Sequence, residues 1–585
     1  MEFSLLVDAF EQMEMTSSRL RLTDHLVSLL RMTPTDIIEK VVYLIQGKLR
    51  PDFEGIEIGM AEKMILRSLA QSSGMGMTAL LEIYRDTGDL GNLAKEAMHH
   101  KDQTSLMPQR MTVERVYSVL YEIAGTTGPR SQEYKIRLVS SIINESSPRE
   151  SRYIIKFIMG SLRLGIADNT VMDALSLAFT GTKTNRMLLE NAYNVSSDLG
   201  TVARILATEG LDAVEKISIA LFKPVRPMLA ERVPTIEDVF HQVKGSAAAE
   251  YKLDGERIQV HKANERVELF SRRLEKITSH FPDISTIIAG SKLSDAIFEG
   301  EVVAIDLDTS NFLPFQVLMH RRRKHGVDEA MKNYPVYLNV FDILYYDGET
   351  KTHLPYSDRR KIIERLVRVI NDHRILLVPQ TLVHDTKSLS NYMSKAIEAG
   401  CEGIMVKQLE SEYRAGARGY AWIKLKREYG SDLTDTLDLV IVGALYGRGR
   451  RVGRYGALLL AAYDPKTDTF KTASKVGTGF TDQHLADFYN SLGRHLLRHK
   501  HPRVHAAIQM DVWFEPKIVI EIVASEITLS PVHTAAMNAI REKYGLALRF
   551  PKFTGKIRDD KNAEDATKVE ELVTLYSQQK RTIQR

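Results

Sequence analysis

The chain has 585 residues and a mass of 66.2 kDa, which at roughly 100 to 200 residues per domain is enough for about three or four folded domains. Hydrophobic residues make up 44% and charged residues 26%, a composition that indicates a folded globular protein and excludes a disordered or fibrous chain. The 79 Lys and Arg against 75 Asp and Glu leave a net charge of +4, which permits a polyanionic partner without requiring one.

Cysteine usage and hydropathy favour one cellular location. A bilayer-spanning helix needs about 18 or more consecutive apolar residues, and the sequence has no such run. Cys401 is the single cysteine, which excludes a disulfide framework and a zinc site built from several thiolates. Glu2, Asp8 and Glu11 stand where a secretory signal would be basic. We therefore expect an intracellular, cytoplasmic protein with no membrane partner.

Residues 1–220 have the pattern of α-helices. Apolar residues recur at spacings of three and four, and strand-like alternation is nearly absent. Helix breaks are predicted at 74–76, 125–129 and 146–148, and the last of these, Ser-Ser-Pro, is also typical of a helix N-terminus. We predict an all-α domain over residues 1–220. Pro224 and Pro227 suppress helix after it and favour an extended linker.

The pattern then changes to short β-rich runs interleaved with helices, which predicts an α+β domain over residues 225–429. The predicted strands are 257–262, 267–271, 296–305 and 336–346, and the predicted helices are 357–370 and 387–399.

Residues 431–585 show several short strands around one helix, which favours a β-barrel of the OB-fold type. The predicted strands are 437–446, 456–463, 469–476 and 512–523, and the predicted helix is 481–492.

Lys252 lies at the most informative point of the sequence, between an apolar run and the strand that starts near Arg257. Gly255 allows close backbone approach there, and Asp254 and Arg257 supply opposite charges. A lysine with the usual pKa of about 10.4 must lose its proton before it can act as a nucleophile. From these residues alone, a surface cluster of ion pairs is an equally good interpretation.

Further acidic and basic side chains that could take part in catalysis or binding follow in strand-like segments. Glu301 lies in an apolar strand, and Glu402 and Lys407 bracket another. In the segment 422–426, alternation places Trp422, Lys424 and Lys426 on one face of a strand, with Ile423 and Leu425 on the other. Two like charges on one face indicate an anion between them.

This ordered set resembles the six motifs of the covalent nucleotidyltransferases, and within them the ATP-dependent DNA ligases of the archaeal and eukaryotic replicative type. The motifs run from Lys252-Leu253-Asp254-Gly255-Glu256-Arg257 to Arg558-Asp559-Asp560-Lys561. Residues 158–165 are also similar to the helical DNA-binding domain of that family. NAD-dependent bacterial ligases are similar only in the core, because one cysteine cannot form their zinc cluster.

The resemblance implies nick sealing in DNA replication, repair and recombination. Lys252 would attack the α-phosphorus of ATP to form lysyl-AMP, AMP would pass to the 5′-phosphate of a nick, and the 3′-hydroxyl would displace it. Glu250 and Phe341 are expected at the adenine, and Lys424 and Lys426 at the α-phosphate. Arg257, Arg272 and Arg418 are expected at ribose or phosphate, with Arg414 as a competitor for the place of Arg418.

Glu301 and Glu402 are expected to share ribose contact and divalent metal binding, with Mg²⁺ or Mn²⁺ as the ion. Lys407 fits either the site or the surface. Arg558 and Lys561 resemble the last motif, which orients the pyrophosphate leaving group. That role implies that the C-terminal domain moves, with a hinge at 428–431.

DNA contact is expected to be independent of sequence, through basic side chains on phosphates. The candidates are Arg163, Lys183, Arg186, Arg448, Arg450, Arg451 and Arg454, and a solvated glycine-rich hairpin tip is the competing interpretation for the last four. Residues 103–107, from Gln103, lie where related ligases bind a sliding clamp but lack the usual aromatic pair, so a loop between helices is favoured. A monomer is expected.

Three alternatives stay open at this stage. The lysine motif is shared with RNA ligases and capping guanylyltransferases, although those enzymes do not usually carry such a helical domain. A DNA-binding scaffold without catalysis is the alternative from another class. ADP or NAD could also replace ATP through small changes around the adenine pocket.

Overall fold

The computed structural model describes residues 1–99, 110–243, 245–305, 312–313, 315–321, 327–426, 436–447, 453–524, 526–549 and 551–583. The chain divides into two compact units, one of Met1–Asp86 with Leu90–Lys426 and one of Thr87–Asp89 with Arg427–Arg585. In the described residues, none of the helices has the length and apolar character needed to cross a membrane.

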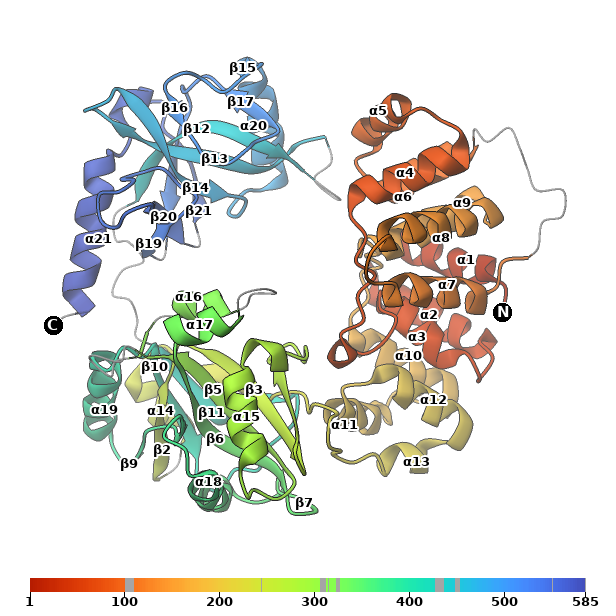
Figure 1. Ribbon diagram of the computed structural model, residues 1–585, viewed down its shortest axis with the longest axis vertical. Coiled ribbons are helices and arrows are strands. Elements are labelled where there is room, and N and C mark those ends of the chain that lie inside the picture. The colour runs from red at the N-terminus through yellow and green to blue at the C-terminus, as the bar shows by residue number, and fades with distance from the viewer. Residues whose placement is uncertain are drawn as a thin grey trace. The chain divides into compact units, whose positions relative to one another are not determined.

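Within residues 1–215, the described parts (1–99 and 110–215) are predominantly helical, as the periodicity predicts (Figure 1). The predicted break at Ser146-Ser147-Pro148 begins a helix, because the Ser147 hydroxyl accepts from the Glu150 N–H while the Glu150 carboxylate accepts from the Ser147 N–H. The helices are α1 Phe3–Glu14, α2 Arg19–Met32, α3 Ile38–Ile45, α4 Glu62–Ser73, α5 Met77–Thr87, α6 Leu90–His99, α7 Val113–Gly125, α8 Ser131–Glu145, α9 Pro148–Ile158, α10 Asp168–Thr180, α11 Arg186–Ser196, α12 Leu199–Glu209 and α13 Leu211–Glu215.

The proline-containing segment 222–227 has neither helix nor strand, as predicted, and it bonds to its neighbours. Val225 is fully buried, and its N–H donates to Gln259 Oε1 over 2.7 Å. The Arg226 N–H donates to the Asn194 carbonyl over 2.8 Å, so the segment bonds to both its helical and its β-rich neighbours.

Two sheets form the β-rich part of this unit. One has the strand order β1-β11-β10-β2-β9, and the other has β4-β3-β5-β6-β7 with β8 beside β6. Their strands are β1 Leu229–Arg232, β2 Ala247–Lys252, β3 Glu256–Ala263, β4 Arg266–Ser271, β5 Ala296–Ala304, β6 Val336–Tyr346, β7 Glu349–Thr350, β8 Ile375–Leu377, β9 Gln380–Val383, β10 Gly403–Gln408 and β11 Arg418–Lys426.

Helices accompany these sheets and cover their apolar faces (Figure 1). They are α14 Ile236–Gln242, α15 Pro282–Gly290, α16 Phe315–Leu318, α17 Val327–Asn333, α18 Tyr356–Ile370 and α19 Thr386–Glu398. The strands β2 and β3 belong to different sheets and are joined by Leu253, Asp254 and Gly255 alone. A side chain at the end of β2 therefore lies where the two sheets come together.

The described residues of the second unit form a β-rich barrel domain with two α-helices. Its strands are β12 Leu437–Tyr446, β13 Tyr455–Asp464, β14 Thr469–Val476, β15 Leu496–Leu497, β16 Val504–His505, β17 Val512–Phe514, β18 Val519–Val523, β19 Glu526–Ser530, β20 Gly545–Arg549 and β21 Lys552–Ile557, and its helices are α20 Asp482–Gly493 and α21 Val569–Ile583. The predicted single strand 512–523 is wrong: it is split into β17 and β18 around Pro516, which cannot donate a ladder hydrogen bond.

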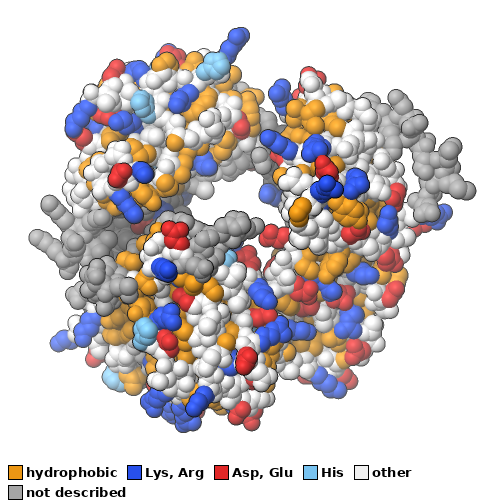
Figure 2. All heavy atoms as spheres, in the orientation of Figure 1, with side chains coloured by type: hydrophobic (Ala, Val, Ile, Leu, Met, Phe, Trp, Pro, Cys, Tyr) orange, Lys and Arg blue, Asp and Glu red, His pale blue; other side chains and the backbone are white. Residues whose placement is uncertain are grey.

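Charges of both signs are interspersed over the visible face of each unit (Figure 2). This distribution agrees with the nearly balanced totals of the sequence.

Candidate active site

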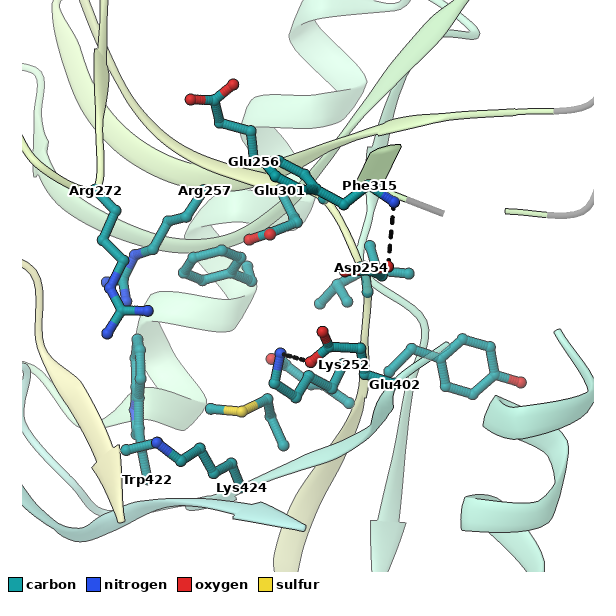
Figure 3. A pocket seen from close by; sticks show the side chains of 18 of the residues that line it. Lys252, Asp254, Glu256, Arg257, Arg272, Glu301, Phe315, Glu402, Trp422 and Lys424 are labelled. Carbon is teal, nitrogen blue, oxygen red and sulfur yellow. Dashed lines mark hydrogen bonds and ion pairs between the residues drawn. The ribbon is translucent and has the colours of Figure 1, made fainter. Parts of the chain in front are cut away.

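A cavity of about 570 Å³ is lined by residues from both sheets of the first unit. Figure 3 shows Lys252, Asp254, Arg257, Arg272, Glu301, Glu402, Trp422 and Lys424 around it. Strand β3 carries Arg257 opposite Glu301 of β5, and β10 runs between β2 and β11. Residues distant in sequence are therefore brought together by strand register.

Lys252 ends β2 and contacts Glu402. Gly403 of β10 is paired with Lys252 on one side and with Lys426 of β11 on the other. Glu402, directly before Gly403, places its Oε2 atom 2.6 Å from Lys252 Nζ and 3.0 Å from Lys426 Nζ. The two ammonium groups thus share one carboxylate at the cavity.

The two glutamates predicted at the site differ in charge state. Burial raises the pKa of Glu402, but the neighbouring ammonium groups of Lys252 and Lys426 outweigh burial and hold that pKa at about 2. Burial raises the pKa of Glu301 to about 7, although Lys252 and Arg257 oppose the shift. At neutral pH Glu402 is ionised, while Glu301 is close to half-protonated.

Lys424 and Lys426 lie on the face of β11 that lines the cavity, together with Trp422. Ile423 and Leu425 are buried in the apolar cluster on the other side. The alternation predicted from the sequence is confirmed. Desolvation, aided by nearby cations, lowers the pKa of Lys424.

Arg257 and Phe341 lie against each other in the cavity wall. The guanidinium carbon of Arg257 is 5.3 Å from the centre of the Phe341 ring. Its Nη2 atom is 2.7 Å from Glu299 Oε2, and its Nη1 atom donates to the Met228 carbonyl over 2.9 Å. These bonds fix the guanidinium, so the Phe341 ring keeps a defined position for a planar ligand.

Lys407 is buried, so its interpretation as a surface residue is wrong. Its Nζ atom is 2.8 Å from Glu250 Oε2 and donates to the Phe341 carbonyl over 3.0 Å. The same atom lies 4.4 Å from the centre of the Trp422 ring. Lys407 therefore contacts both residues predicted at the adenine, Glu250 of β2 and Phe341 of β6.

Most of the predicted site residues line this one cavity. They are Glu250, Lys252, Arg257, Arg272, Glu301, Phe341, Glu402, Lys424 and Lys426. Arg418 does not belong to the lining; it begins β11 and is exposed, and its competitor Arg414 is also outside the lining. Arg273, next to Arg272, does line the cavity and was not predicted.

Arg558 and Lys561 lie in the second unit, where both bind Asp438 of β12. Arg558 Nη1 is 2.6 Å and Lys561 Nζ is 2.7 Å from Asp438 Oδ2. Asp560 pairs with the same guanidinium over 2.6 Å. The cations of the last motif are therefore gathered at one buried carboxylate.

The basic side chains proposed to contact DNA differ in whether they already pair with other groups of the protein. Arg163 and Lys183 are exposed, whereas Arg186 is 2.9 Å from Glu190 and 3.4 Å from Asp173. Arg454 Nη1 donates to the Asp482 carbonyl over 2.8 Å. Arg448, Arg450 and Arg451, the hinge at 428–431 and the clamp segment at Gln103 lie outside the described residues.

Sequence reasoning missed the residues that hold the site from behind. Tyr356 and Gln380 bond to Glu250, and Tyr413 donates to Glu299 over 3.0 Å. These residues belong to separate segments with no shared motif, so only the folded chain identifies them.

The donor set of the cavity fits a divalent metal. Within the described ranges, no group of three or more His, Cys, Asp or Glu is placed to hold a metal ion by protein ligands alone. Glu301 and Glu402 nevertheless supply two carboxylates at the cavity. Mg²⁺ commonly binds one or two carboxylates together with substrate phosphates and waters, so these two suffice when phosphates are present.

A lysine at a strand end, among cations and carboxylates in a cavity between two sheets, in a chain that also contains a barrel domain, is typical of the class of covalent nucleotidyltransferases. The family matches narrow this class. Residues 2–176 match the family described as DNA ligase N terminus, residues 227–426 the ATP dependent DNA ligase domain, and residues 451–561 the ATP dependent DNA ligase C terminal region.

Relatives match over the full length. The chain is 51% identical to a DNA ligase of Nitrosopumilus maritimus, over 99% of each chain, and 49% identical to DNA ligase 2 of Thermofilum pendens, over 99% of this chain and 98% of that one. A solved structure named Pmar-Lig_PreS3 has a similar fold, with a TM-score of 0.55 and 16% identity, covering 94% of this chain and 99% of that one. The chain belongs to the family of ATP-dependent DNA ligases.

Proposed function

We propose that the protein joins the 5′-phosphate and 3′-hydroxyl of a nick in duplex DNA at the expense of ATP, with Lys252 as the nucleophile. The observation that carries this proposal is the position of the Lys252 amine in the cavity, beside Glu402 and among Arg272, Lys424 and Lys426. A polyphosphate in this cavity would meet several cations next to one amine.

In the first step Lys252 gives up a proton to solvent and its amine attacks the α-phosphorus. The new P–N bond forms, the bond to pyrophosphate breaks, and the second proton of the attacking nitrogen also passes to solvent. Glu402 has a pKa of about 2, so it is too weak a base to keep the proton of the amine. We assign it the role of holding Nζ at the end of β2. Lys424 and Lys426 balance the charge on the α-phosphate.

The later steps use the same site. The 5′-phosphate of the nick attacks lysyl-AMP and releases Lys252, and the 3′-hydroxyl then attacks the activated phosphate and releases AMP. Glu301 and Glu402 would hold Mg²⁺ or Mn²⁺, which supplies Lewis-acid charge neutralisation at the phosphates. Glu250 and Phe341 would bind the adenine, while Arg257 and Arg272 would bind ribose or phosphate.

The domain roles are part of this proposal. Residues 1–220 would bind DNA, 225–429 would perform adenylation, and 431–585 would alternate between ATP and DNA through Arg558 and Lys561. One monomer would act on one nick. The family match supports this division, because its three profiles follow the same order along the chain.

The test is incubation with α-labelled ATP and Mg²⁺, followed by a denaturing gel and addition of nicked DNA. Wild type should retain covalent label and release it as AMP when the nick closes, whereas Lys252→Ala should take up none. Lys361→Ala, an exposed lysine that pairs with Asp358, is the matched control. Label that never passes to DNA would indicate an RNA ligase or capping enzyme, and absence of label from any nucleotide would leave a scaffold.

A further inference from the structure

The carboxylate of Glu250 is held by an unusually complete set of donors. Its side chain is 2% exposed and lies on β2, two residues before Lys252. Oε2 is 2.8 Å from Lys407 Nζ, and Oε1 accepts from the Tyr356 hydroxyl and, over 3.2 Å, from Gln380 Nε2. Arg360 Nη1 is 3.5 Å from Oε1. These donors orient the buried carboxylate and prevent its rotation.

Tyr356 is itself held in place by neighbouring residues. It is 1% exposed at the start of α18, and Gln380 Nε2 donates to its hydroxyl oxygen over 2.6 Å. One turn later Arg359 forms a fully buried pair with Asp342 of β6, over 2.7 Å and 3.1 Å. Burial raises the pKa of Tyr356 far above its usual range, so the hydroxyl stays a donor at neutral pH.

Glu250 lines the cavity, whereas Tyr356 and Gln380 do not. An ionised carboxylate only accepts hydrogen bonds, so toward a nucleobase it attracts an amino group and repels a carbonyl oxygen. A purine with an amino group at position 6 is therefore accepted, and one with a carbonyl oxygen there is rejected. This discrimination depends on a carboxylate that cannot turn away.

We propose that Tyr356 is a positioning residue that fixes Glu250 as an acceptor for the 6-amino group of the base, and so sets the preference for ATP over 6-oxo purine nucleotides. Gln380 supports the same arrangement, because it bonds to both Tyr356 and Glu250. The inference rests on the proposed function, since it requires that ATP loads the cavity with its base beside Glu250.

The test compares three nucleotides in self-adenylation of the full chain: ATP, GTP, and purine riboside triphosphate, whose base lacks the 6-amino group. For Tyr356→Phe we expect the ATP concentration at half-maximal rate to rise about tenfold with an unchanged maximal rate, because a hydrogen bond to a charged group is lost. The value for purine riboside triphosphate should not change. The preference for ATP over GTP should fall by the same factor of about ten.

Tyr392→Phe is the matched control. Tyr392 lies on α19 with its ring 5.1 Å from that of Tyr251, and its buried hydroxyl has no hydrogen-bond partner among the described residues. It should leave all three nucleotides unchanged. Gln380→Ala, at a half-buried position, tests the same idea without touching the aromatic core, and we expect the same loss of discrimination to a smaller degree.

The results distinguish failure of the role proposed for Tyr356 from failure of the proposed function. Equal changes for ATP and purine riboside triphosphate in Tyr356→Phe would show a merely structural role and overturn the inference, as would wild-type discrimination in both variants. If Tyr356→Phe fails to fold, Gln380→Ala decides. If wild type takes up no label from ATP, the proposed function itself fails.

Discussion

Lys252 Nζ lies 2.6 Å from Glu402 Oε2, at the point where the end of β2 is paired with the beginning of β10. The backbone repeats this connection, because the Glu402 N–H donates to the Lys252 carbonyl over 2.9 Å. The proposed nucleophile is thus held by main chain and side chain of one residue. Its orientation toward the cavity is fixed before any nucleotide binds.

Replacing Glu402 by Gln should disturb the orientation of Lys252 without disturbing the fold. The amide keeps the shape but loses the charge that holds Lys252 and a proposed metal ligand, so we expect self-adenylation to fall by about 100-fold, in the range of a lost electrostatic contact at a reacting centre. More Mg²⁺ should be needed for half-maximal rate. Glu349→Gln, at a glutamate whose side chain is 77% exposed, is the control. An unchanged rate and Mg²⁺ requirement in Glu402→Gln would contradict the assignment.

Glu301 should give the reaction a pH dependence near neutrality. Because its pKa is raised to about 7, the carboxyl is neutral below this pH and ionised above it. If the ionised form binds metal or ribose, the rate of self-adenylation at limiting Mg²⁺ should rise about tenfold from about pH 6 to about pH 8. Glu301→Gln should be slow and lose this inflection. A variant that keeps the inflection would assign it to another group.

The same shift has a consequence for stability. Between the usual pKa of 4.5 and the raised value of about 7, the folded chain holds more protons at Glu301 than the unfolded chain does. The contribution of this group to the free energy of unfolding therefore falls as pH rises through that window and stays lost above it. Denaturant titration of the isolated wild type at both ends of the window, beside Glu301→Gln, should show a larger gain for the variant at the higher pH.

Arg558→Ala should impair the first step and spare the last. Arg558 is placed by Asp438 and Asp560, and we assign it to the pyrophosphate leaving group. We expect self-adenylation to fall by about 100-fold, as for other lost contacts to developing charge. Sealing of a nick that already carries AMP should proceed at close to the wild-type rate. Unimpaired self-adenylation in Arg558→Ala would contradict the role assigned to Arg558 at the pyrophosphate.

Binding to nicked DNA should weaken steeply as salt is added, because phosphate contacts release counterions. Lys183 is exposed, whereas Arg186 is already paired with Glu190 and Asp173. Lys183→Ala should therefore lower the slope of log affinity against log salt by about 1, and Arg186→Ala by less. The measurement is a salt titration of binding to a labelled nicked duplex. A flat response in wild type would contradict phosphate-led binding.

Local patterns in the sequence determined much of the first unit. The Ser147 cap, the strand from Val336 to Tyr346 and the face shared by Lys424 and Lys426 all follow from periodicity and turn chemistry within a few residues. Such features need no knowledge of distant parts of the chain.

The sequence predicts most of the long helices and strands and the motif residues, because both depend on short-range spacing. The burial of Lys407 against Glu250, the position of Arg418 outside the cavity and the bond from Tyr356 to a carboxylate 106 positions away follow from tertiary packing. These contacts depend on strand order and on the packing of α18 behind the sheet. Neither has a local signature, because a buried charge is tolerated only where the whole fold supplies its partners.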